Sequence, residues 1–233
     1  MSWEINVKTF AFEGQTIIED FYAQLEPGAT LGLIGPSGCG KSTLLNLIAG
    51  LRECHTWSCT IPTDKLTYIF QEPRLLPWLT VQDNILLVAP HAQSLCIELL
   101  AELGLSQYRT HYPNTLSGGM QRRVAIARAF ITQPQILLLD EPFVSLDQPT
   151  ATACRDLLKT LMERFATSAI FVTHDPYEAV SICDDILFLS SDPMRIIQHL
   201  KIAPGSTAEN NMNVFKQLLQ LHPGLLTGSL HTI

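Results

Sequence analysis

The residues of this chain best suited to chemistry lie between positions 35 and 43. Gly35, Gly40, Lys41 and Ser42 fit the pattern G-x-x-x-x-G-K-[ST] of a phosphate-binding loop. Glycines let the backbone approach an anion closely, and successive N–H groups of such a turn cradle phosphate oxygens. A helix beginning at Lys41 adds unpaired N–H groups and the positive end of its dipole. We therefore expect phosphates to be bound by Gly35, Pro36, Ser37, Gly38, Cys39, Gly40, Lys41, Ser42 and Thr43.

Two residues of this loop have more specific chemistry. Lys41 can reach β- and γ-phosphates, and the hydroxyl of Ser42 can bind Mg²⁺. The alternative is a Gly-rich turn that binds nothing. The context disfavours it, because an apolar strand is predicted at residues 30–34 and apolar residues at helical spacing follow the loop to about Ala49.

A pair of acidic residues, Asp140 and Glu141, follows the apolar run 136–139. A buried strand of this kind delivers its last side chains to the sheet edge at which α/β proteins bind ligands. Asp140 can hold Mg²⁺ through water, and Glu141 can activate the water that attacks a γ-phosphate. Alone, this pattern is an ordinary strand end, but after a phosphate loop it favours a metal site.

The spacing of apolar residues predicts an α/β protein with an all-helical insertion. Strands are expected at residues 4–12, 17–25, 30–34, 66–70, 135–139, 168–172, 185–189 and 195–200, and a short one at 60–61. Helices are expected at residues 41–49, 81–88, 92–103, 120–132, 150–165, 176–183 and 214–221, with a linker at 204–213. The last two strands are expected to form a closing pair.

Composition excludes several classes of protein. The chain has 233 residues, is 46% hydrophobic and carries a net charge of −7, so it can bury a core and has no basic footprint for nucleic acid. No apolar run approaches the ~18 residues that span a bilayer, and the N-terminus is unlike a signal peptide. We expect a cytosolic protein with reduced cysteines. Cys54, His55 and Cys59 could form half a zinc site, but no second pair follows at finger spacing.

Further motifs, in order along the chain, resemble those of ATP-binding cassette proteins. Residues 116–121 look like the signature motif, Gln71 matches the Q-loop glutamine, residues 145–147 match the D-loop and His174 matches the switch histidine. The resemblance extends from about Ile5 to Leu200. It implies a P-loop NTPase core of RecA-like type, with an N-terminal antiparallel β subdomain and an inserted α-helical subdomain that carries the signature. One ATPase domain is then divided into a core at 1–71 and 134–203, a helical subdomain at 72–133 and a C-terminal tail at 204–233.

The resemblance also implies ATP and Mg²⁺ as cofactors, with ATP held between two cassettes in a head-to-tail dimer. The implied catalytic residues are Lys41, Gln71, Glu141 and His174, and the implied metal ligands are Ser42, Gln71 and Asp140. Ser117, Gly118 and Gly119 would contact the γ-phosphate bound by the second cassette, and Asp147 would join the same nucleotide site. The signature loop also suits a cap for the helix that follows it.

Two positions leave alternatives open. Phe12 lies where the family places an aromatic residue that stacks on adenine, but Phe10 competes for this role and either residue could belong to the core. The family commonly reads Arg-Gln-Arg after the residue that matches Met120, whereas this chain reads Gln121-Arg122-Arg123. The role usually given to that glutamine is therefore open.

Residues 70–81, 140–143 and 192–197 are similar to importers of the nitrate, sulfonate and taurine group. This similarity implies two permease subunits, a second ATPase subunit and a periplasmic or lipid-anchored substrate-binding protein as partners, no nucleic acid, and a place on the cytoplasmic face of the inner membrane. Nitrate, alkanesulfonates, taurine and thiamine-precursor pyrimidines all remain open as substrates. Residues 74–78, which include Trp78, are expected to dock the permease, and ordinary packing is the alternative.

Two other functions compete with transport. A non-transport cassette ATPase of DNA repair or translation tends to carry two cassettes, long insertions or basic faces, which this chain lacks. A regulatory subunit without turnover would not need both Glu141 and His174.

Overall fold

The computed structural model describes residues 2–203 and 205–228. Within them the chain forms two compact units. The first unit runs up to Leu66 and resumes at Ser168, and the second extends from Thr67 to Thr167. The helical insertion expected at 72–133 lies within the second unit.

The first unit contains a small antiparallel sheet. Its strands, in spatial order, are β2 (Gln15–Leu25), β1 (Trp3–Phe12) and β4 (Trp57–Cys59). Ile5, Val7 and Phe10 of β1 are buried between exposed residues, as expected of a strand in a sheet with one covered face. The strand predicted at 60–61 lies instead at 57–59, because pairing with Ile5 to Val7 of β1 sets its position.

The first unit also contains a mixed sheet in which β7 (Ser168–Val172), β3 (Thr30–Ile34), β8 (Asp185–Leu189) and β9 (Ile196–Lys201) follow one another. β3 pairs in parallel with both β7 and β8, and β9 pairs antiparallel with β8, which confirms the predicted closing pair. Every residue of β3 and β7 is buried, so their apolar runs are those of strands covered on both faces.

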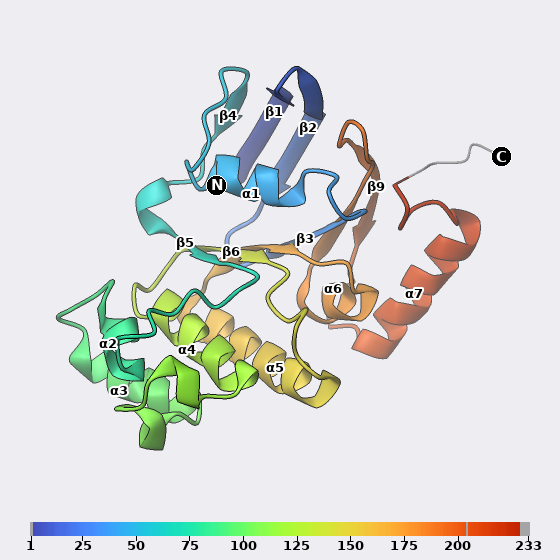
Figure 1. Ribbon diagram of the computed structural model, residues 1–233. Coiled ribbons are helices and arrows are strands. Elements are labelled where there is room, and N and C mark those ends of the chain that lie inside the picture. Colours follow the sequence, from blue (N-terminus) through green and yellow to red (C-terminus); the bar gives the residue numbers. More distant parts are fainter. Residues whose placement is uncertain (1, 204, 229–233) are drawn as a thin grey trace. The chain divides into compact units, whose positions relative to one another are not determined.

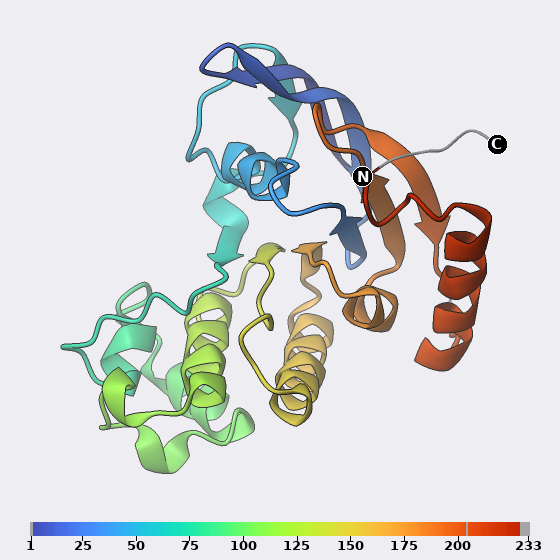
Figure 2. The same cartoon turned by 45° about the vertical axis from the view of Figure 1, so that its right-hand side comes forward.

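Three helices belong to this unit: α1 (Lys41–Ile48), α6 (Pro176–Ile182) and α7 (Ala208–Leu221). α7 lies beside α6 (Figures 1 and 2), and its Phe215 packs on Phe188 of β8 with ring centroids 5.4 Å apart. The prediction that α7 starts at Val214 was wrong, because the Thr207 side chain accepts a hydrogen bond from Asn210 N and caps the helix six residues earlier. Pro204 and residues 229–233 of the predicted tail lie outside the described residues.

The second unit joins two neighbouring strands, β5 (Leu66–Ile69) and β6 (Ile136–Asp140), to a group of helices. These are α2 (Val81–Leu86), α3 (Gln93–Glu102), α4 (Gly118–Phe130) and α5 (Gln148–Phe165). In Figures 1 and 2, α4 has α5 on one side and the pair α2 and α3 on the other. The predicted helices are confirmed, but α4 begins at Gly118 and not at Met120, because Ser117 caps it.

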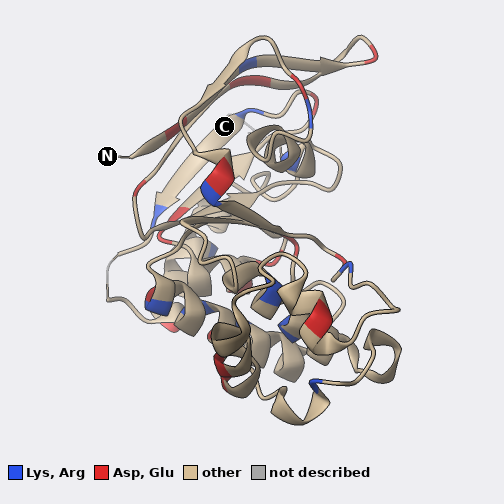
Figure 3. Cartoon of the chain, turned by 90° about the vertical axis from the view of Figure 1, so that its left-hand side faces the viewer, with Lys and Arg blue, Asp and Glu red and all other residues tan. Residues whose placement is uncertain are grey.

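Acidic and basic residues are both spread along the described chain. In Figure 3, basic (blue) and acidic (red) residues lie at many separate places along the cartoon. None of the helices in residues 2–203 and 205–228 has the length and apolarity needed to cross a membrane.

Candidate functional site

The phosphate loop lies between the end of β3 and the start of α1. Gly40 has φ 117°, a left-handed conformation that side-chain-bearing residues rarely adopt, and it ends the loop at the N-terminus of α1. Lys41 is 5% exposed, and its Nζ donates hydrogen bonds to the carbonyl oxygens of Gly35, at 2.8 Å, and Pro36, at 2.7 Å. An ammonium group is therefore buried against the loop, where an anion would need it.

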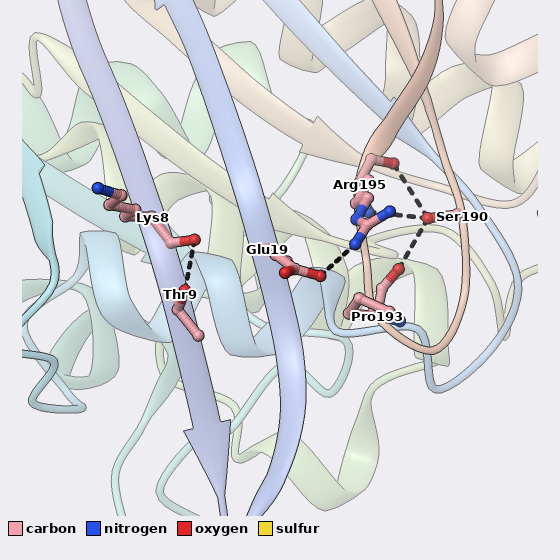
Figure 4. A network of polar contacts seen from close by, with 6 residues as sticks. All are labelled: Lys8, Thr9, Glu19, Ser190, Pro193 and Arg195. Atoms are coloured by element: carbon pink, nitrogen blue, oxygen red, sulfur yellow. Dashed lines mark hydrogen bonds and ion pairs between the residues drawn. The ribbon is translucent and has the colours of Figure 1, made fainter.

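The loop is braced by β2 and by the turn after β8. A Cβ on Gly40 would lie 3.0 Å from Ile17 Cγ2 and 3.6 Å from the sulfur of buried Met194. Met194 N donates to Ile17 O at 2.8 Å, so the turn is bonded to β2 at the point that touches the loop. Figure 4 shows that Arg195 ties the same turn to Glu19 of β2 by an ion pair.

Within the phosphate loop itself, Lys41 is the charged side chain. Cys39 lies inside the loop with its sulfur 3.8 Å from Lys41 Nζ. Burial raises the pKa of the Cys39 thiol, and the nearby ammonium offsets this only in part. The thiol is therefore neutral at neutral pH, and the loop keeps its positive potential.

His174 follows β7, and its side chain is exposed. The turn that presents it is fixed by buried Thr173, whose Oγ1 donates to Glu178 Oε2 at 2.6 Å and accepts from Asp175 N at 3.0 Å. The Asp175 side chain in turn caps α6. The position of His174 is thus set by hydrogen bonds on both sides of the turn.

The two phenylalanines at the end of β1 have different surroundings. Phe10 is 6% exposed and belongs to the core, whereas Phe12 is 51% exposed. The guanidinium of Arg52 lies 5.1 Å from the centroid of the Phe12 ring. Of the two candidates, only Phe12 offers a ring face to a base.

In the second unit, β6 ends at Asp140 and is followed by Glu141. Glu141 has φ 43°, a strained conformation for a residue with a side chain. The hydroxyl of Tyr68 in β5 donates to Asp140 Oδ2 at 3.1 Å. Burial and the neighbouring carboxylate raise the pKa of Tyr68, so its hydroxyl remains a donor to Asp140.

A cavity of about 500 Å³ opens beside Asp140. It brings Gln71 and Asp140, two of the predicted metal ligands, to one place. Its lining residues are Phe70, Gln71, Glu72, Arg74, Asp140, Val144 and Ser145. Among the described residues no three His, Cys, Asp or Glu side chains cluster as metal ligands would, and all six cysteines are free thiols.

The signature residues start α4. Ser117 Oγ accepts a hydrogen bond from Met120 N at 3.3 Å, and Ser117 and Gly118 are exposed. Gly119 is buried, and a Cβ there would overlap Cγ2 of Thr150 in α5, so a larger residue would force the Thr150 side chain to move. A hydrogen bond from the Thr150 hydroxyl lowers the pKa of Asp147 at the start of α5. The carboxylate of Asp147 is therefore ionised at neutral pH.

The reversed order after Met120 has a visible consequence. Gln121 Nε2 donates to the carbonyl of Pro113 at 2.9 Å and so holds the loop before the signature. Arg122, the next residue, instead donates to the carbonyls of Phe70 and Gln71, which follow β5. Sequence reasoning missed this contact and the one from Tyr68 to Asp140, because both join residues more than fifty positions apart.

These features define a class of protein. A glycine-rich loop at a helix N-terminus with a buried lysine, together with a strand that ends in Asp-Glu, belongs to P-loop nucleotide-binding proteins. The phosphate loop, His174 and Phe12 lie in the first unit, and Gln71, Asp140, Glu141, Asp147 and the signature lie in the second.

Comparison with known proteins identifies the family. The profile of the ABC transporter family matches residues 18–144. The chain is 43% identical over 200 residues to the aliphatic sulfonates import ATP-binding protein SsuB 1 of Pseudomonas savastanoi pv. phaseolicola, an alignment that covers 85% of this chain and 84% of that protein. It is 42% identical to the SsuB protein of Bacillus subtilis, covering 82% and 80%. With the SsuB protein of Bacillus cereus it shares 38% identity over 99% and 100% of the two chains.

A solved structure agrees with this assignment. The dimeric post-hydrolysis structure of the ATP-binding cassette MJ0796, bound to ADP and phosphate, is similar with a TM-score of 0.74 and 29% identity, covering 87% of this chain and 99% of that one. The chain belongs to the ABC transporter family. It is the subunit type of that family that binds and hydrolyses ATP. The predicted fold class and the predicted family are thereby confirmed.

Proposed function

We propose that this chain powers an importer of aliphatic sulfonates. The carrying observation is its similarity, over most of its length, to proteins named as aliphatic sulfonate import subunits in both Pseudomonas and Bacillus. Of the substrates left open by the sequence, this favours alkanesulfonates over nitrate, taurine or pyrimidines.

At the phosphates, residues 35–43 hold ATP through backbone N–H groups, and Lys41 balances the charge on the β- and γ-phosphates. The burial of Lys41 against the Gly35 and Pro36 carbonyls supports this role, because anion binding would recover the cost of burying the ammonium. Phe12 stacks on the adenine, which its 51% exposure allows.

The donor set of Ser42, Gln71 and Asp140 fits Mg²⁺, since hydroxyl, amide and carboxylate oxygens are the hard ligands that this ion prefers. Mg²⁺ bound there would neutralise charge on the phosphates. Tyr68 orients Asp140 for this task through its hydrogen bond to Oδ2. Glu141 accepts the proton of the attacking water, and His174 orients the γ-phosphate.

Two cassettes form a head-to-tail dimer, and the similar cassette MJ0796 bound to ADP and phosphate is dimeric, which supports an assembly of two. Ser117, Gly118 and Gly119 contact the γ-phosphate bound by the partner, and Asp147 lies in the same interface. Exposure of Ser117 and Gly118 at the start of α4 supports this, because the first N–H groups of a helix attract anions.

The partners are two permease subunits and a periplasmic or lipid-anchored binding protein, so the chain works on the cytoplasmic face of the inner membrane. We assign residues 72–133 to a helical subdomain that faces the permease. Its docking loop is 74–78. Trp78 in this loop is 70% exposed, as expected of an interface residue whose partner is not bound.

The experiment is uptake and ATP turnover in vesicles that contain the chain, its permease and its binding protein. We expect ethanesulfonate to stimulate Mg-ATP hydrolysis and to accumulate in the vesicles, whereas nitrate does neither. Stimulation by nitrate and not by ethanesulfonate would contradict the substrate. Uptake that is independent of ATP would contradict the function as a whole.

A further inference from the structure

The segment 70–80 has an unusual set of attachments. It contains Gln71 at one end and Trp78 near the other, and it forms no helix or strand of its own. Three side chains of α2 and α4 hold most of its backbone carbonyl groups. All of these residues belong to the second unit.

Arg122 of α4 holds the Gln71 end. It is 2% exposed, and its Nη1 donates to Phe70 O at 2.7 Å while Nη2 donates to Gln71 O. Burial lowers the pKa of Arg122 to about 10, so the group remains charged at neutral pH. Charge-assisted bonds to two successive carbonyls fix the backbone on both sides of the Gln71 Cα.

Arg128, further along α4, holds the middle. Its Nη1 donates to Arg74 O at 2.9 Å and its Nη2 to Pro73 O at 2.8 Å. The guanidinium of Arg74 lies 3.7 Å from the centroid of the Phe70 ring, and this ring stacks on Tyr68 with centroids 4.0 Å apart. The start and the middle of the segment are therefore also joined to each other.

Asn84 of α2 holds the Trp78 end. It is fully buried, and its Oδ1 accepts from Leu76 N at 2.8 Å. Its Nδ2 donates to the carbonyls of Leu76 at 3.1 Å, Leu79 at 3.1 Å and Thr80 at 3.0 Å. These bonds replace the backbone partners that a segment without regular structure lacks.

We propose that Asn84, Arg122 and Arg128 are positioning residues that make the segment 70–80 one body with α2 and α4. A displacement of Trp78 then moves Gln71 and the start of α4 together. The inference rests on the proposed function, in which Trp78 touches the permease and Gln71 and Ser117 act at nucleotide. Packed side chains with directional bonds can transmit such a displacement, and a measured coupling is the required proof.

The test compares Arg128→Met, Arg128→Lys and Asn84→Ala with the control Arg164→Met. Arg164 pairs with Glu98 at 2.8 Å and Glu102 at 2.6 Å, so the control removes an equally bonded arginine of the same unit away from the segment. The measurements are kcat and KM for Mg-ATP with the full chain, and hydrogen exchange of residues 70–80 and 117–121.

We expect Arg128→Met and Asn84→Ala to lower kcat about tenfold while KM changes by less than about twofold, because misplaced groups lose rate more than affinity. Exchange should quicken over both 70–80 and 117–121. Arg128→Lys should recover part of kcat, and Arg164→Met should resemble the natural chain. Asn84 is the critical position, because its bonds lie at the end of the segment far from Gln71.

The proposal is overturned if Arg128→Met and Asn84→Ala keep the kcat of Arg164→Met, or if each speeds exchange only beside its own bonds. Should Asn84→Ala fail to fold, the Arg128→Met variant, which changes a partly exposed residue, is judged by the same criteria.

Lys41→Ala, assayed in parallel, distinguishes failure of the proposed function from failure of the positioning proposal. Normal hydrolysis by Lys41→Ala would reject the phosphate site itself. If Lys41→Ala loses activity while Arg128→Met and Asn84→Ala keep it, the phosphate site stands and only the positioning role of Asn84, Arg122 and Arg128 is rejected.

Discussion

At the scale of the residue, the proposed role of Lys41 in holding the phosphates can be tested directly. It is buried, and two loop carbonyls hold its ammonium. We expect Lys41→Ala to lower ATP hydrolysis at least about 100-fold, because the loop loses its point charge on the phosphates. Phosphate release and calorimetric titration with ATP measure this. Lys65→Ala, an exposed lysine in the same unit, is the matched control, and equal activity of both variants would contradict the assignment.

Phe10 and Phe12 provide a second residue-scale comparison. Phe12→Ala should weaken ATP binding about 5- to 100-fold with little loss of stability, since stacking on a base contributes about 1–3 kcal/mol. Phe10→Ala should instead lower the free energy of unfolding by about 3–5 kcal/mol, because it empties a core position. Titration with ATP and urea unfolding separate the two effects. A Phe12→Ala variant that binds ATP normally would show that another group holds the base.

Tyr68 tests the orientation of Asp140. Tyr68→Phe keeps the ring that stacks on Phe70 but removes the donor to Asp140 Oδ2. We expect the free Mg²⁺ concentration for half-maximal ATPase activity to rise about tenfold, as loss of a partner of a metal ligand typically does. Because the pKa of Tyr68 is raised, its hydroxyl stays protonated from pH 6 to 9, so the effect should not vary over that range. An unchanged Mg²⁺ requirement would mean that Asp140 needs no such support.

At the scale of the element, the exposed end of the segment 70–80 is the surface most suited to a partner. Trp78→Ala should leave folding and ATP binding intact, because the side chain is 70% exposed and is not one of the proposed phosphate ligands. It should weaken association with the permease at least about 10-fold, which corresponds to the loss of an interface anchor. Pull-down with the permease in detergent measures this. The control is Ile97→Ala, an exposed apolar residue of α3, and equal effects of the two variants would place the docking surface elsewhere.

At the scale of the whole molecule, the proposed dimer of cassettes can be tested with a variant that binds ATP but does not hydrolyse it. Glu141→Gln preserves shape but removes the base, so we expect hydrolysis to fall by about 10²–10⁴-fold while ATP still binds. The variant should then elute as a dimer with Mg-ATP and as a monomer without nucleotide. Size-exclusion chromatography with light scattering distinguishes these states. If the variant remains monomeric at high ATP and protein concentration, the dimer must depend on the permease.

The sequence by itself determined the phosphate loop, the strands 30–34 and 168–172 and the acidic strand end, because each depends on neighbouring residues. Glycine conformation, helix capping and the apolar runs of buried strands are local signals. The same kind of signal was available for α7, since Thr207 marks its start, but the composition of residues 204–213 concealed it. The family motifs also follow from short, ordered stretches, and the comparisons confirmed the family they indicate.

Only the tertiary structure decided which phenylalanine is exposed, where β4 pairs and what Arg122, Arg128 and Asn84 hold. Phe10 and Phe12 lie on one strand, and the packing of its sheet buried the first and left the second open. Arg122 and Phe70 are 52 positions apart, and Arg128 and Pro73 are 55 apart. A carbonyl group accepts from any donor that folding brings near it, and its residue type carries no mark of that donor. For this reason the bonds that position Gln71 could be found only after the helices were packed.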